Sequence, residues 1–218
     1  MRRARSVLLL CVLLAVAAAV GDAMADGAPR PGAILAGGPR FVGFPTGRAD
    51  ATPQFDFARL DGAAAPEVQT IAAAVAGLSP LAQLYAVNAR VNRVPRRDDW
   101  SNYGVADHWA TPREFFRRGG DCEDFAIAKY AVLERLGWPP ERLWIVVLRE
   151  TVMSPVHAVL MVEHAGRLWT LDNLGDPPFE HGGLDYYRPA YSLNRFGQWS
   201  HGAPAGLAGQ RASASGAR

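Results

Sequence analysis

The sequence predicts one α+β domain in which N-terminal helices pack on an antiparallel sheet. Helical spacing of apolar residues is confined to positions before 137, and short β-rich apolar runs begin after position 142. Helices followed by strands are typical of this fold class. The chain has 218 residues, 49% of them hydrophobic, two cysteines and a formal net charge of +2. These values exclude a disordered chain and a disulfide-built miniprotein, and they give no basic excess for nucleic-acid binding.

The first 25 residues have the pattern of a secretory signal peptide. Three arginines precede an apolar run over residues 7–20, and Ala23-Met24-Ala25 matches a small-x-small cleavage site. About 14 apolar residues are too few to cross a hydrocarbon core of about 30 Å. We therefore expect cleavage after Ala25, export, and no stable insertion into a membrane. Cleavage would leave a chain with no formal net charge and Cys122 as its single cysteine.

The exported chain divides into three parts by composition. Residues 26–55 are rich in Gly, Pro and Ala and are expected to be irregular. Residues 56–202 form the predicted domain. Residues 203–218 form a low-complexity tail.

Four segments of the domain are predicted to be helical. Proline at the first helical position and glycine after the last are the main boundary signals. The predicted helices cover residues 66–77, a segment from Pro80 with Ser79 as N-cap, a segment from Thr111 to Gly119 with a capping box to Glu114, and residues 121–136.

Three strands are predicted after the helices. Residues 143–148, 156–163 and 167–171 are β-rich apolar runs, and His164-Ala165-Gly166 is the predicted turn between the last two. The predicted domain therefore ends in an antiparallel sheet.

Cys122 falls in the first turn of the last predicted helix. Unpaired amides give a helix N-terminus partial positive charge, which favours the nucleophilic thiolate over the thiol. Gly119 and Gly120 precede it and would let a substrate approach closely. The alternative is a small apolar residue packed beneath the helix start. The position favours a reactive cysteine.

His157 is the predicted base, and Asp172 is predicted to orient it. A histidine in an apolar strand needs a polar partner. A four-residue loop between the strands predicted over 156–163 and 167–171 would place His157 directly opposite Asp172. A two-residue loop would make them diagonal neighbours on one face. A three-residue loop would place them on opposite faces unless a bulge intervenes. A satisfied core histidine is the alternative, but the pair together fits a nucleophile, base and orienter arrangement.

Three acidic residues, Asp121, Glu123 and Asp124, surround the cysteine. Like charge disfavours a thiolate, and a cluster of hard oxygen ligands suits Ca²⁺. The residues alone favour helix caps at Asp121 and Asp124 with a solvated Glu123 over a metal site.

Several blocks of the sequence resemble the bacterial transglutaminase-like cysteine proteinases. The residues that carry this resemblance lie within about 80–180. They are Gly120-Asp121-Cys122-Glu123-Asp124-Phe125-Ala126-Ile127-Ala128-Lys129-Tyr130, His157-Ala158-Val159-Leu160, Leu171-Asp172-Asn173-Leu174, Asn88, Asn92, Asp107-His108-Trp109 and Thr111-Pro112.

The resemblance implies a papain-like, transglutaminase-type fold and a catalytic triad of Cys122, His157 and Asp172. It also implies calcium as cofactor, with Asp121 and Glu123 as ligands. Family members act in the periplasm, where they cleave a large surface adhesin near its N-terminus and so control biofilm attachment. An inner-membrane cyclic-di-GMP receptor restrains them through its periplasmic domain and is a possible partner here.

Two other functions remain open on the sequence. A transglutaminase-type acyl transferase would use the same triad with an amine as acceptor. A calcium-dependent binding module on the same fold would not use the thiol at all.

Overall fold

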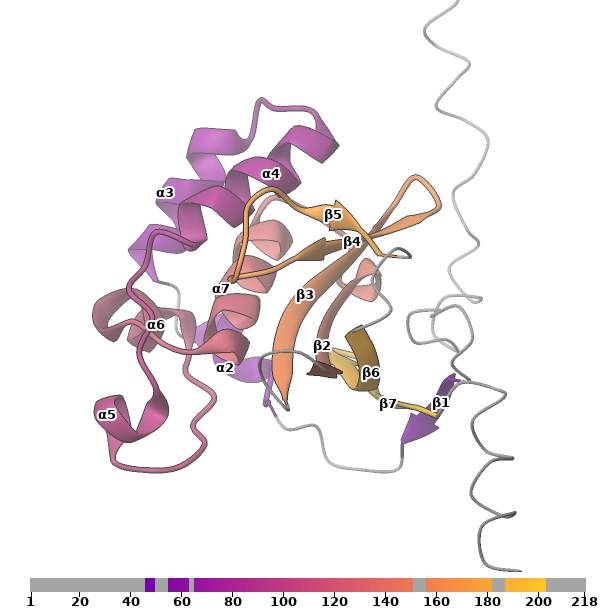
Figure 1. Ribbon diagram of the computed structural model, residues 1–218. Helices are drawn as coiled ribbons and strands as arrows, with labels where there is room; N and C mark the ends of the chain where they lie inside the picture. The colour runs from indigo at the N-terminus through magenta and orange to yellow at the C-terminus, as the bar shows by residue number, and fades with distance from the viewer. Residues whose placement is uncertain (1–45, 50–54, 63–64, 151–155, 182–186, 203–218) are drawn as a thin grey trace, which may run out of the picture. The chain divides into compact units, whose positions relative to one another are not determined.

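The computed structural model describes residues 46–49, 55–62, 65–150, 156–181 and 187–202 (Figure 1). They form helices followed by a seven-stranded antiparallel sheet, which confirms the predicted fold class. The predicted signal peptide and the tail over 203–218 lie outside the described residues. Within the described ranges, no helix has the length and apolar character needed to cross a membrane.

The helices begin where proline and capping residues favour them. Pro66, Pro80 and Pro112 each open a helix, and Thr111 and Glu114 form the predicted capping box. Ser79 is the N-cap residue of its helix but makes no capping hydrogen bond through its side chain. The helices are α2 (Ala58–Gly62), α3 (Pro66–Val75), α4 (Pro80–Val91), α5 (Asp99–Tyr103), α6 (Pro112–Arg118) and α7 (Cys122–Arg135), and a 3₁₀ turn, η2, covers Pro140–Arg142.

The strands form one sheet with the order β1-β7-β6-β2-β3-β4-β5. Their bounds are β1 (Thr46–Ala49), β2 (Leu143–Glu150), β3 (His157–His164), β4 (Arg167–Leu171), β5 (Phe179–Glu180), β6 (Tyr187–Asn194) and β7 (Gly197–His201). The three predicted strands are β2, β3 and β4. The structure adds β1 within the segment expected to be irregular, and it adds β5, β6 and β7 after the predicted sheet.

A tight turn sets the register between β3 and β4. His164 pairs with Arg167, so the turn consists of Ala165 and Gly166, which both have positive φ angles of 52° and 73°. Such a two-residue turn matches the twist of a hairpin. The register continues to Leu160 opposite Leu171. Of the loop lengths considered above, the two-residue loop is therefore the one observed.

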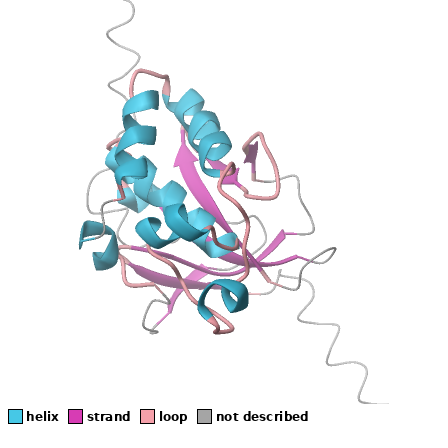
Figure 2. Cartoon of the chain, turned by 90° about the vertical axis from the view of Figure 1, so that its left-hand side faces the viewer, coloured by secondary structure: helices cyan, strands magenta, loops and turns pink. Residues whose placement is uncertain are grey.

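Helix α7 lies between the other helices and the sheet (Figure 1). It contacts α3, α4 and α6, and it also contacts β2 and β3. In Figure 2 the helices lie in front of much of the sheet. Alternate residues of β2 enter two separate apolar clusters, because both faces of this strand are covered. The first residue of α7 is thus fixed against the beginning of β3.

Candidate active site

Two glycines lead the chain into α7. Gly119 has a φ of +81°, and a Cβ there would lie 2.3 Å from the carbonyl oxygen of Pro95. A Cβ on Gly120 would lie 2.2 Å from Oδ2 of Asp124. Real Cβ atoms do not approach other atoms so closely, so both positions require glycine for packing reasons. This turn places Cys122 as the first residue of α7, as the sequence predicts.

The thiol of Cys122 is partly buried and donates a hydrogen bond to Oε2 of Glu123 at 3.1 Å. Burial and the neighbouring Glu123 carboxylate raise the pKa of Cys122 above its usual range. The backbone amide of Ala158 donates to the sulfur and lowers this pKa, but by less. The helix N-terminus therefore does not by itself produce the expected thiolate. Burial, which is the larger cause, and the charge of Glu123 both favour the protonated thiol.

His157 and Asp172 meet as a buried pair. Nε2 of His157 lies 2.9 Å from Oδ1 of Asp172, and both side chains are about 5% exposed or less. The same oxygen accepts a hydrogen bond from the amide of Leu174 at 2.8 Å. His157 begins β3, and the next residue, Ala158, donates to the sulfur of Cys122. The structure thus pairs His157 with Asp172 and places the residue after His157 in contact with the sulfur of Cys122.

Five carboxylates crowd around the start of α7. Oxygens of Asp99, Asp121 and Asp124 lie within 4.8 Å of one another, and so do oxygens of Asp99, Asp107 and Glu123. The sequence predicts Asp121 and Glu123 as metal ligands with Asp124 in the same acidic cluster, and the structure adds Asp99 and Asp107 beside them. A set of hard oxygen ligands of this kind suits a divalent cation such as Ca²⁺.

Three oxygens of this cluster are buried and lack a hydrogen-bond donor within the described part of the chain. They belong to Asp99, Asp121 and Asp124. Burial raises the pKa of Asp124 to about 8, and it also raises the pKa of Asp121 together with the charge of Glu123. Asp121 makes no capping hydrogen bond through its side chain, so the capping alternative does not account for it. The donor set fits a bound cation.

Asp99 is the ligand candidate that the sequence did not reveal. It is buried in the five-residue helix α5, where the preceding Asp98 acts as the N-cap. Asn102 on the same helix donates to the carbonyl oxygen of Gly119 at 3.2 Å and holds α5 against the turn before α7. No sequence spacing relates Asp99 to Cys122, because the intervening loop and α6 bring them together.

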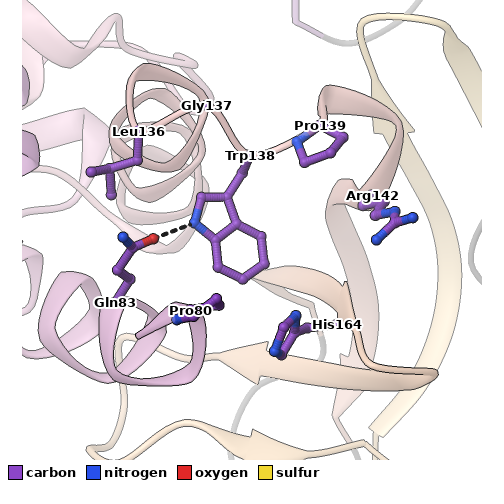
Figure 3. Close-up of a pocket in the computed structure, with 8 residues that line it drawn as sticks. All are labelled: Pro80, Gln83, Leu136, Gly137, Trp138, Pro139, Arg142 and His164. Carbon is purple, nitrogen blue, oxygen red and sulfur yellow. Dashed lines mark hydrogen bonds between the residues drawn. The ribbon is translucent and has the colours of Figure 1, made fainter. Parts of the chain in front are cut away.

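A separate pocket of about 280 Å³ lies at the opposite end of α7 (Figure 3). Its floor is the indole of Trp138, whose Nε1 donates to Oε1 of Gln83 at 2.8 Å. His164 stands edge-on to this indole at the rim. None of the residues lining this pocket belongs to the predicted site, so the pocket does not mark the catalytic chemistry.

Comparison with protein families identifies the class of protein. The model of the bacterial transglutaminase-like cysteine proteinases matches residues 62–190, more than half of the chain. The chain belongs to this family. The residues quoted above for the resemblance fall within the matched range, and no curated protein matches the chain.

Solved structures similar to the chain include LapG from Legionella pneumophila. The calcium-bound form of LapG is 28% identical, and the match covers 62% of this chain and 76% of that chain with a TM-score of 0.56. The EGTA-treated form is 27% identical over 66% and 82% of the two chains, with a TM-score of 0.55. The chain therefore has the transglutaminase-like fold of LapG.

Proposed function

We propose that the chain is a calcium-dependent cysteine endopeptidase in which Cys122, His157 and Asp172 form the catalytic triad. One observation carries this proposal: the sulfur at the first residue of α7 lies against β3 beside a His157 that is bonded to Asp172. A histidine bonded to an aspartate, next to the residue whose amide contacts the sulfur, supports an arrangement of nucleophile, base and orienter. Membership of a cysteine proteinase family supports it independently.

In the proposed mechanism, His157 accepts the thiol proton and the sulfur of Cys122 attacks the carbonyl carbon of the scissile peptide. Amides at the start of α7 stabilise the oxyanion. The C–N bond then breaks, His157 gives its proton to the leaving amine, and a thioester remains. Water attacks the thioester while His157 takes its proton, the C–S bond breaks to release the carboxylic acid product, and His157 returns the proton to the sulfur of Cys122. Asp172 orients the imidazole and stabilises its charged form.

Asp121 and Glu123 are the proposed calcium ligands, with Asp99, Asp107 and Asp124 within reach of the same site. Bound calcium supplies positive charge that offsets these carboxylates. Calcium held by these residues would offset the charge of Glu123 and would thereby lower the pKa of the neighbouring Cys122 thiol. The existence of calcium-bound and EGTA-treated structures of LapG supports this choice of metal.

We further propose a periplasmic location and a large secreted adhesin, cut near its N-terminus, as the substrate. The signal-peptide pattern of residues 1–25 supports export. The family resemblance described in the sequence analysis implies an adhesin-cleaving role in biofilm attachment, with the periplasmic domain of an inner-membrane cyclic-di-GMP receptor as a possible regulator.

The proposal is tested by incubating purified protein with candidate adhesins secreted by its host, with calcium or with EGTA. We expect cleavage only with calcium, and none with a folded Cys122→Ala variant. Cleavage by that variant would remove Cys122 from the mechanism. A parallel reaction with a primary amine separates the acyl-transferase alternative, since a transferase would attach the amine to the new carboxyl end.

A further inference from the structure

The loop that follows β4 carries Asp172 and is tied to α4 by two asparagines. Nδ2 of Asn92 donates to the carbonyl oxygen of Asp172 at 2.9 Å and to Oδ1 of Asp176 at 3.0 Å. Nδ2 of Asn88 donates to the same oxygen of Asp176 at 2.6 Å and to the carbonyl of Gly175 at 3.1 Å. Both ends of the segment 172–176 are therefore anchored on one helix.

A buried lysine reaches the same loop from α7. Lys129 is fully buried, and its Nζ donates to the carbonyl oxygen of Leu171 at 3.3 Å, directly before Asp172. Burial lowers the pKa of Lys129 to about 7, although the charges of Asp172 and Asp176 oppose this. Burying an ammonium group is costly unless it is paired.

Lys129 is also the only lysine in the sequence, since every other basic residue is an arginine. Lysine offers a slender stem and three rotatable donors, whereas the arginine fork is planar and larger. The single lysine of the chain therefore lies at the position where a compact donor must reach a loop carbonyl through the core.

These contacts bear on the orientation of Asp172. Its Oδ1 accepts from Nε2 of His157 and from the amide of Leu174, so the direction of the carboxylate depends on the backbone of its own loop. Helix α7 carries both Cys122 at its start and Lys129 two turns later. One helix therefore locates the proposed nucleophile and also the loop of the proposed orienter.

We propose that Asn88, Asn92 and Lys129 are positioning residues that hold the Asp172 carboxylate against His157. The inference rests on the proposed function, because Asp172 matters only if His157 serves Cys122. Loss of a positioning residue lets the carboxylate turn away from the imidazole, and catalysis falls although the nucleophile and base remain.

The experiment measures the rate of alkylation of Cys122 by iodoacetamide, with calcium present at neutral pH, in a double-mutant cycle of Asn92→Ala and Asp172→Ala. We expect Asn92→Ala alone to slow alkylation by about tenfold, because small misplacements of a catalytic group have large effects. In the Asp172→Ala background, Asn92→Ala should change the rate by less than about twofold, because its effect passes through Asp172.

Gln83→Ala is the matched control. Gln83 is a carboxamide on the same helix that holds the indole of Trp138 at the other end of α7 (Figure 3). This control variant should alkylate at the wild-type rate. A second readout is the downfield proton resonance of the His157–Asp172 hydrogen bond, which Asn92→Ala should shift or abolish and Gln83→Ala should leave in place.

Four results would overturn the inference, and only the last of them would also overturn the proposed function. An equal slowing by Asn92→Ala in both backgrounds would mean that the asparagine acts without Asp172. If Asn92→Ala did not slow alkylation, or if Gln83→Ala slowed it equally, the contact would contribute only to stability. If Asp172→Ala itself left the rate unchanged, the proposed triad would fail and the inference would fail with it.

Discussion

Burial and the hydrogen bond to Glu123 both favour the protonated form of Cys122. The thiol donates to a carboxylate in a partly buried site, and both burial and that charge raise the pKa of Cys122. Glu123 is also one of the proposed calcium ligands. A single side chain therefore connects the metal cluster to the proposed nucleophile.

Glu123→Gln should separate these two effects. In EGTA, we expect Cys122 to react with iodoacetamide several-fold faster in this variant than in the wild type at pH 8, because the charge that raises the thiol pKa is gone. Added calcium should accelerate the wild type but have little effect on the variant.

Glu163→Gln is a suitable control, since Glu163 is exposed on β3 and its loss should change neither rate. A Glu123→Gln variant that reacts no faster than the wild type in EGTA would show that burial alone controls the thiol.

At the scale of single elements, α6 connects the loop of the acidic cluster to the turn before α7. Its N-terminus is fixed by Thr111, whose amide and hydroxyl both donate to Oε2 of Glu114 at 2.8 Å. The amide of Glu114 in turn donates to the hydroxyl of Thr111. These bonds satisfy donors that a helix start otherwise leaves unpaired.

Thr111→Ala should lower the unfolding free energy by about 1 kcal/mol, because it removes the cap. For a protein of this size such a loss corresponds to a decrease in Tm of roughly 2–4 °C. Thermal unfolding followed by circular dichroism measures it. Thr70→Ala on the exposed face of α3 is the control, and a loss of equal size there would contradict a specific role for the cap.

The sequence predicted the elements with strong local signals. α6 and α7 have clear ends at capping residues and glycines, and the β3–β4 hairpin has a turn with two adjacent residues of positive φ. The helix α5 and the strand β1 were not predicted, because elements of four or five residues show too little periodicity.

The long-range contacts also could not be predicted from the sequence. β6 contains Pro189 and lacks regular alternation, and it pairs with β2 across a bulge after Val147. The sequence limited the relative position of His157 and Asp172 to a few arrangements, one for each loop length, because a hairpin has few registers. Asp99 could not be placed beside Cys122, because only the packing of α5 on the turn before α7 joins them.

For the whole molecule, the acidic cluster links calcium, protons and stability. Burial raises the pKa of Asp124 to about 8 from an ordinary value of 3.8, so the folded metal-free protein retains protons that the unfolded chain releases. These carboxyls therefore make the unfolding free energy decline as pH rises from about 4 to about 8. Calcium bound at the proposed site would have to displace the same protons, so its affinity should rise with pH over this range.

We therefore expect calcium to raise the Tm more at pH 8 than at pH 5. Differential scanning fluorimetry with calcium or EGTA across this range measures the difference. Asp121→Asn removes one of the titrating carboxyls, so its calcium-induced shift should be smaller and should depend less on pH. An equal calcium shift at both pH values would contradict protonation of the cluster.

The contact between Cys122 and Glu123 has a further consequence for the chemical survival of the protein. Oxidation by peroxide proceeds through the ionised sulfur, so a thiol that keeps its proton reacts slowly. Removal of the predicted leader, which contains Cys11, would leave Cys122 without a second cysteine for a resolving disulfide. The carboxylate that delays activation would then also preserve the sulfur from sulfinic and sulfonic damage until the metal arrives.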